Sequence, residues 1–196
     1  MTDLVVVSLE PWDEIWRRNQ HLVAGLLRAD PALRVLFVEP PADPLYAARS
    51  GRRPTPGRGV HAVRGLAGIG EGRLWTLHPT KWLPRRIDPG ADRRLAARVV
   101  RAARGLGMHS PVLWVNDPLG AAVLAATGWP TLYDVTDDWL LADRDPRERA
   151  RLTELEGRLL RDAAEIVVCS PALATSKGRT RPVTLVPNGV DLAAYR

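Results

Sequence analysis

The stretch Val183-Thr-Leu-Val-Pro-Asn-Gly189 joins an apolar, β-branched run to a turn sequence. Residues 183–186 favour a strand. Pro187 fixes its own φ, and Asn188 and Gly189 tolerate a positive φ, so the chain is expected to leave a sheet here through a tight turn. We therefore expect residues 1–186 to form one domain and residues 187–196 to begin a linker toward a second domain.

The sequence before this stretch alternates short apolar runs with amphipathic segments. Leu152, Leu155 and Leu159, for example, fall on one stripe of a helical pattern. This alternation is typical of parallel βαβ units, and it predicts an α/β, Rossmann-like, doubly wound and mainly parallel sheet of seven strands. Residues 40–72, rich in Pro and Gly, are expected to form a long loop or a short hairpin. The expected strands are 4–9, 34–39, 73–77, 112–115, 131–135, 165–169 and 183–186, and the expected helices are 14–28, 92–106, 119–126, 146–163 and 171–176.

The composition limits the class of protein. The chain has 196 residues and one cysteine, Cys169, so neither a disulfide framework nor a cysteine metal site can form within it. The first apolar run is too short for a signal peptide, and no run approaches the ~20 residues that cross a bilayer. We expect a reduced, cytoplasmic setting, at most peripheral to the inner face of a membrane.

The net charge of +6 comes almost entirely from arginine. Codon bias in a GC-rich genome is one explanation, and attraction to anions is the other. The basic loop 49–58 and the arginine-faced helix 92–106 are expected either to contact an anionic membrane surface or to be solvated surface. No zinc-finger spacing or ribonucleoprotein motif is present, so we expect no nucleic-acid partner.

Ligands of doubly wound sheets bind at the carboxyl ends of the strands, and the first such end carries an unusual set of side chains. Aromatic faces can stack on sugar rings, and arginine forks match phosphate or carboxylate. The alternative is that the tryptophans pack under the sheet and the arginines are solvated. The binding candidates in this segment are Trp12, Asp13, Trp16, Arg17 and Arg18.

Other expected strand ends add polar candidates. Asn116 and Asp117 follow strand 112–115, and His78 follows strand 73–77. Asp137, Asp138 and Trp139 follow strand 131–135, where a carboxylate could position a hydroxyl or take its proton, which makes Asp137 and Asp138 the catalytic candidates. The alternative for each Asp is a cap or turn, where Asp is common in any case.

Two patterns argue against a metal or a dinucleotide cofactor. Asp143-Arg144-Asp145 is typical of an acidic loop before a helix rather than of a metal motif after a strand. The glycine-rich segment 65–72 has Arg73 where the dinucleotide fingerprint needs glycine, and it precedes a strand instead of a helix. We expect no metal site and no bound cofactor, and the same failure argues against an oxidoreductase.

Four segments together resemble a known family. SLEPWDEIWRRNQHLVAGLL (8–27), LYDVTDDW (132–139), EIVVCSPAL (165–173) and VPNGVD (186–191) are similar to the N-terminal domain of retaining GT-B glycosyltransferases of the family-four type, which build bacterial cell-surface polysaccharides. The resemblance covers the whole chain. It implies that this domain binds the acceptor and that chemistry is metal-independent.

The same resemblance implies a division of labour with a second domain. A nucleotide-sugar donor would be held by a C-terminal domain absent from this sequence, with Asn188 and Gly189 near the interdomain cleft. The acceptor would be a glycan or a lipid-linked molecule, gripped by the candidates above. The chain is then expected to be inactive alone. The alternative is a non-catalytic module that binds a glycan or a partner protein.

Overall fold

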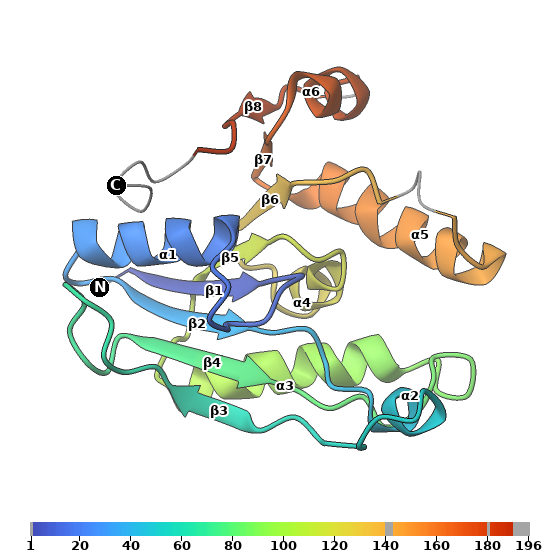
Figure 1. Ribbon diagram of the computed structural model, residues 1–196. Coiled ribbons are helices and arrows are strands. Elements are labelled where there is room, and N and C mark those ends of the chain that lie inside the picture. Colours follow the sequence, from blue (N-terminus) through green and yellow to red (C-terminus); the bar gives the residue numbers. More distant parts are fainter. Residues whose placement is uncertain (1, 140–142, 180, 190–196) are drawn as a thin grey trace.

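A computed structural model describes residues 2–139, 143–179 and 181–189 (Figure 1). Strands and helices alternate along it except that β4 follows β3 directly, and the described strands join one sheet in the order β3-β4-β2-β1-β5-β6-β7-β8. The strands are β1 (Asp3–Val7), β2 (Arg34–Val38), β3 (Gly59–Ala62), β4 (Leu74–His78), β5 (Val112–Val115), β6 (Thr131–Val135), β7 (Glu165–Val168) and β8 (Thr184–Leu185). The helices are α1 (Arg18–Ala29), α2 (Pro44–Arg49), α3 (Ala91–Gly105), α4 (Gly120–Thr127), α5 (Pro146–Asp162) and α6 (Pro171–Lys177).

The doubly wound α/β architecture is confirmed, and the strand count is corrected. The described sheet has eight strands instead of seven, and the additional strand is β3. β3 pairs antiparallel with β4, while every other pairing is parallel. Both β3 and the short helix α2 fall within residues 40–72. β3 is mostly exposed on an edge of the sheet, so it needs no strong hydrophobic alternation to form.

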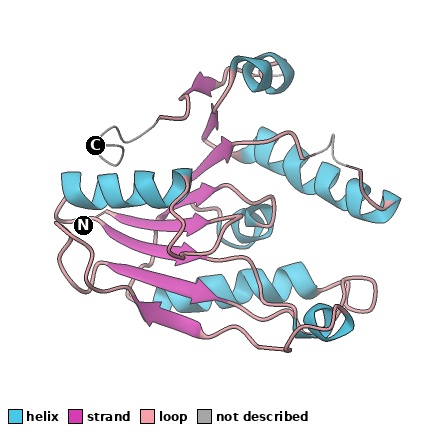
Figure 2. Cartoon of the chain, in the orientation of Figure 1, coloured by secondary structure: helices cyan, strands magenta, loops and turns pink. Residues whose placement is uncertain are grey.

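Helices cover both faces of the sheet (Figure 2). Alternate side chains of a strand point to opposite faces. Val6 and Phe37 pack with Leu27 of α1 on one face. Val5 and Val7 belong to the larger cluster on the other face, which α3, α4 and α5 cover. Nearly all of β1, β2 and β5 is buried, as expected for parallel strands with helices on both sides.

The strand order places the switch point of the sheet between β1 and β5. From β1 the chain winds through β2 to β4, and after α3 it returns to β5 and winds the other way. Connections from neighbouring strands therefore diverge at this point, and ligands of open α/β sheets bind at the carboxyl ends of the strands beside such a point. The expected linker is described only as far as residue 189, and residues 190–196 lie outside the described part.

One helix starts later than the sequence predicts. We expected a helix from residue 14, but α1 begins at Arg18. Gln20 explains the difference, because its buried side-chain oxygen accepts a 2.8 Å hydrogen bond from the Arg17 backbone N–H. The same side chain donates to the Pro11 and Ile15 carbonyls. These bonds hold residues 11–17 as a loop above the sheet instead of a first helical turn.

Within the described residues, no helix is both long and apolar enough to cross a membrane.

Candidate functional site

A buried polar cluster lies at the switch point. Asn19, in the first turn of α1, donates from Nδ2 to Ser8 Oγ at 3.1 Å and to Asn116 Oδ1 at 2.8 Å. Asn116 in turn donates to the carbonyl of Asp134 at 3.0 Å and to Thr136 Oγ1 at 3.3 Å. Ser8, Asn19 and Asn116 are each at most 3% exposed. The cluster therefore links the ends of β1, β5 and β6 in fixed positions.

An ion pair extends this cluster toward the last described residues. Arg18 donates from Nε and NH2 to the two carboxylate oxygens of Asp134, each at 3.3 Å. The Asp134 side chain is only 2% exposed, so Arg18 supplies the countercharge that a buried carboxylate requires. Arg18 NH1 also donates to Asn188 Oδ1 at 3.0 Å. The structure thus brings together Arg18 and Asn188, which lie 170 residues apart; Gly189 follows directly in the same segment.

The aromatic candidates pack partly against the core. Trp12 stands edge-on to Phe37 of β2 with ring centroids 5.0 Å apart, and Trp16 stands edge-on to Trp12 at 5.8 Å. His21 extends the row, 5.3 Å from Trp16. Both tryptophans remain half-buried. Each ring therefore supports the 11–17 loop and still has area left for contact with a ligand.

Glu39 fixes the base of this loop, and sequence reasoning did not single it out. Its carboxylate is buried, and Oε1 accepts a 3.0 Å hydrogen bond from the Trp12 backbone N–H. His78 Nδ1 lies 3.7 Å from Glu39 Oε2, so the structure places His78 at the same edge as Trp12. The signal that could have found Glu39 is its position directly after a buried strand.

Charged side chains crowd the outer rim. Arg17 lies 3.2 Å from Asp13 Oδ1 and 3.5 Å from Glu10 Oε1. Burial raises the pKa of Glu10, and the nearby carboxylates of Asp13 and Asp137 add to this effect against the lowering by Arg17. Asp137 is exposed and follows β6 by two residues, so this catalytic candidate lies at the same carboxyl edge of the sheet as the acceptor candidates.

Asp138, the second catalytic candidate, is held in a structural network. Lys177 Nζ of α6 lies 2.9 Å from Asp138 Oδ1 and 3.0 Å from Glu156 Oε1 of α5. Tyr133 donates to the same Glu156 oxygen at 3.2 Å, and burial raises the pKa of Tyr133 well above its usual value. Burial lowers the pKa of Lys177, but its two carboxylate partners outweigh that effect and raise it. Asp138 therefore has an anchoring contact, whereas Asp137 forms no salt bridge with any residue that the structure describes.

Asp117 and Trp139 complete the set of sequence candidates. Asp117 Oδ1 accepts from the Leu119 backbone N–H at 2.8 Å, a turn contact that leads into α4. Burial raises the pKa of Asp117, against opposing effects of Arg85 and Arg151. The Arg144 guanidinium lies over the Trp139 ring, 5.8 Å from its centroid. Asp117 thus faces the arginines of the α5 side, and Trp139 stacks on its own loop.

A groove of about 660 Å³ lies along the same edge of the sheet, between α2, the loop 79–90 and the start of α5. We call it the arginine groove, because its lining includes Arg49, Arg85, Arg86, Arg147 and Arg151. No sequence motif indicated it, since its residues come from three segments that are distant in the chain.

The rim as a whole offers amide, hydroxyl and carboxylate groups around a switch point, with two half-buried tryptophans beside them. Such groups can orient the hydroxyls of a polar ligand, and Asp137 is a carboxylate exposed to it. In the described ranges, no three His, Cys, Asp or Glu side chains gather closely enough to hold a metal ion. Ser8, Asn19 and Glu39 belong to the site although sequence reasoning did not name them as candidates.

Comparison with known proteins connects this arrangement to a fold. No protein-family model matches the chain, and no curated protein matches it significantly. Solved structures do match: sucrose-phosphate synthase from Thermosynechococcus elongatus has a TM-score of 0.56 at 14% identity, over 99% of this chain and 93% of that chain. A UGT transferase from Siraitia grosvenorii in complex with UDP has a TM-score of 0.55 at 15% identity, over 96% of this chain.

A third match is a trehalose-6-phosphate synthase from E. coli bound with UDP-2-fluoro glucose, with a TM-score of 0.51 at 11% identity over 90% of this chain. These neighbours are GT-B glycosyltransferases. This chain has a GT-B Rossmann-like fold. It spans 51% of the Siraitia chain and 42% of the E. coli chain, about half of each. At these identities the likeness is one of fold, and the family-four and polysaccharide assignments remain predictions.

Proposed function

We propose that this chain is the N-terminal, acceptor-binding half of a retaining glycosyltransferase. The complete enzyme would transfer a sugar from a nucleotide-sugar to a glycan or a lipid-linked acceptor in the assembly of cell-surface polysaccharide. The observation that carries the proposal is the buried Ser8–Asn19–Asn116 cluster at the switch point of a GT-B Rossmann-like sheet. It stands at the edge where such sheets bind ligands.

In this proposal the rim receives the acceptor. Trp12 and Trp16 offer apolar faces for a sugar ring, and the exposed carboxylates of Asp13 and Asp137 bind its hydroxyls. Asp137 is the side chain we assign to the reacting hydroxyl, because it is exposed on this rim, whereas Asp138 is held by Lys177. The position of Asp137 is the basis of this assignment. Asp137 would orient the hydroxyl and receive its proton as the new bond forms.

The donor is assigned to a second domain, in cis or in trans. Arg18 and Asn188 meet beside the acceptor rim, so the segment that follows β8 leaves the sheet at the proposed site. A domain that follows this segment could place a nucleotide-sugar over the rim without a metal ion. We further propose a cytoplasmic location, peripheral to the inner face of the membrane.

A binding experiment tests the acceptor role. Isotope-labelled chain is titrated with methyl glycosides of glucose, galactose, mannose and N-acetylglucosamine, and amide shifts are followed by NMR. We expect shifts in residues 8–17, 116–117 and 134–139. Asp137→Asn should weaken binding, whereas Asp162→Asn, an exposed change at the far end of α5, should not. Shifts confined to other surfaces would overturn the acceptor role.

An activity experiment tests the dependence on a second half. The chain is incubated with radiolabelled UDP-glucose and the same glycosides, and transfer is measured. We expect no transfer by residues 1–196 alone, because the groups assigned here bind only the acceptor. Efficient transfer would contradict the proposed division. Glycoside binding that never contributes to turnover, even with a donor domain added, would instead favour a non-catalytic glycan-binding module.

A further inference from the structure

The arginine groove is a second concave surface at the carboxyl edge of the sheet. Three connections meet there: α2 follows β2, the loop 79–90 follows β4, and α5 follows β6. Its volume of about 660 Å³ falls in the range of small-molecule sites. Six of its lining side chains are Arg or Lys, and three are Asp or Glu. The groove is therefore basic, and its lining is assembled by the fold.

Carboxylates behind the groove fix two of its arginines. Asp92 of α3 accepts from Arg85 Nε and from Arg151 NH1, each at 2.7 Å. Glu148 binds the other edge of the Arg151 guanidinium, at 2.6 Å from NH2 and 2.9 Å from Nε. The loop, α3 and α5 are joined through Asp92. Arg85 and Arg151 are thereby held in fixed directions before any ligand arrives.

Three further arginines line the groove without such partners. Arg49, Arg86 and Arg147 are exposed, and none of them forms a salt bridge with a side chain in the described part of the protein. They come from α2, the loop and α5, so their charges converge from three sides. Like charges brought together in this way repel each other, and a bound anion would remove that repulsion.

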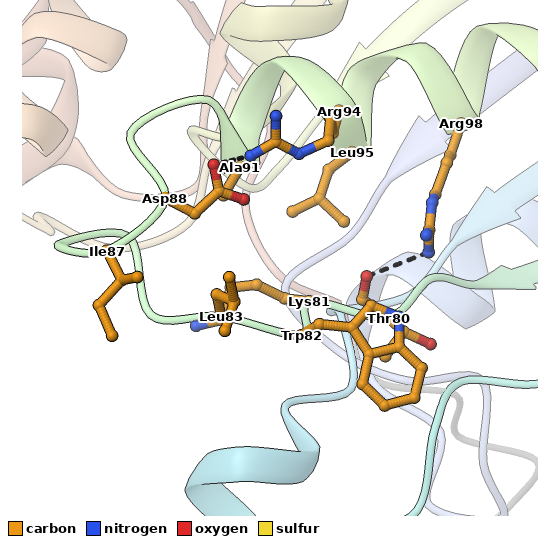
Figure 3. Close-up of a pocket in the computed structure, with 10 residues that line it drawn as sticks. All are labelled: Thr80, Lys81, Trp82, Leu83, Ile87, Asp88, Ala91, Arg94, Leu95 and Arg98. Carbon is orange, nitrogen blue, oxygen red and sulfur yellow. Dashed lines mark hydrogen bonds and ion pairs between the residues drawn. The ribbon is translucent and has the colours of Figure 1, made fainter.

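The loop 79–90 also lines a second, neighbouring pocket of about 350 Å³ against α3, and Lys81 lines both pockets. The apolar side chains of this second pocket, Trp82, Leu83 and Ile87, are called the apolar lip. Trp82, Leu83 and Ile87 are 57%, 45% and 56% exposed, among the most exposed large apolar residues described. Figure 3 shows this second pocket, with the three apolar side chains on the loop and Arg94 of α3 paired to Asp88. A basic groove with an apolar lip fits a ligand that carries an anionic group next to an apolar portion.

We propose that the arginine groove binds a phosphate or diphosphate group of the acceptor. The guanidinium fork matches phosphate oxygens in bidentate geometry, and three of the arginines that line this groove, Arg49, Arg86 and Arg147, form no salt bridge in the described part of the protein. The proposal rests on the proposed function in one respect, because it takes the phosphate to belong to the acceptor molecule. The phosphate could be carried by a soluble sugar phosphate or by a lipid headgroup, and the experiment separates these two sources.

The first measurement is calorimetric titration of the chain with inorganic pyrophosphate at low salt. Arg86→Gln/Arg147→Gln removes two of the unpaired groove cations, and we expect binding to weaken roughly tenfold or more. The control, Arg101→Gln/Arg104→Gln, removes the same charge from exposed positions near the C-terminal end of α3. These positions are at the opposite end of the helix from Asp92, which contacts the groove arginines. The control should change binding less than twofold. Equal losses in both variants, or no pyrophosphate binding by the wild type, would overturn the proposal.

The second measurement identifies the source of the phosphate. Flotation compares phosphatidylcholine vesicles with and without phosphatidic acid, using wild type, the groove variant and Trp82→Ser/Leu83→Ser/Ile87→Ser. Binding that needs phosphatidic acid, the groove arginines and the apolar lip supports a lipid source. Competition of glucose 6-phosphate with pyrophosphate, without vesicle binding, supports a soluble source. Neither measurement involves sugar transfer or glycoside binding at the rim, so the groove and the proposed function can fail independently.

Discussion

Replacing Lys177 with methionine leaves a buried carboxylate without its cation. Lys177 Nζ lies 3.0 Å from Glu156 Oε1, and the Glu156 side chain is 2% exposed. Asp138, the other partner, is more exposed and can be hydrated, so most of the loss comes from Glu156. Removing one partner of a buried ion pair costs about 3–5 kcal/mol. That is a large part of the 5–15 kcal/mol that is typical of a whole domain.

Urea unfolding followed by tryptophan fluorescence measures this loss, since the chain has seven tryptophans. The matched control is Glu156→Gln/Lys177→Met, which keeps the oxygen that Tyr133 bonds but removes both charges. We expect the double variant to recover most of the stability. A loss below about 1 kcal/mol in Lys177→Met, or no recovery in the double variant, would refute the reasoning.

The contribution of Lys177 and its carboxylate partners to stability depends on pH in a defined direction. The pKa of Lys177 is raised in the folded state, so the fold favours the charged ammonium. Its contribution is therefore fully present below the ordinary pKa of 10.5 and is lost as pH rises through the folded value. We expect wild-type stability to fall faster above that pH than the stability of Lys177→Met.

Four other changes have clear expected outcomes. A Cβ at Gly57 would meet backbone carbonyls at the end of β4, so Gly57→Ala should lower the free energy of unfolding by about 1–3 kcal/mol. A Cβ at Gly25 in α1 meets nothing within 4 Å, so Gly25→Ala should raise the free energy of unfolding by about 0.5–1 kcal/mol. Thermal unfolding measures both changes. Leu159→Ala should cost about 2–5 kcal/mol in urea, because Leu159 is fully buried in the core; a loss under ~1 kcal/mol would contradict that packing. A hydrogen bond from Arg151 lowers the pKa of Glu148, so the advantage of wild type over Glu148→Gln should be present above pH 4.5 and vanish as pH falls through the folded value.

The parallel part of the fold could be predicted from sequence because its signal is local. Buried strands such as β1 and β2 are short continuous apolar runs, and α3 and α5 show clear apolar stripes, so their bounds agree within a residue or two. α2 and β3 lack such a signal. They lie in a segment of Pro, Gly and Arg, and β3 depends on pairing with β4, which composition does not reveal.

The candidate site could be predicted only as an edge of the sheet. The rule that ligands bind after parallel strands located Trp12, Asn116 and Asp137 along one rim. It could not show that Asp138 pairs with Lys177, or that Arg18 pairs with Asp134, because these contacts join residues 39 and 116 positions apart. The arginine groove escaped notice for the same reason.

The buried Gln20 fixes the backbone path of the 11–17 loop, whereas the outward side chains of the loop determine what it can bind. The loop is held from below by the fully buried Gln20 amide, which bonds only to main-chain groups at Pro11, Ile15 and Arg17, and by Glu39, which accepts from the Trp12 main-chain N–H. Main-chain groups are the same whatever side chain they carry. The outward side chain of Ile15 can therefore be exchanged without rerouting the chain, so that ligand preference could change by a single substitution on an unchanged support.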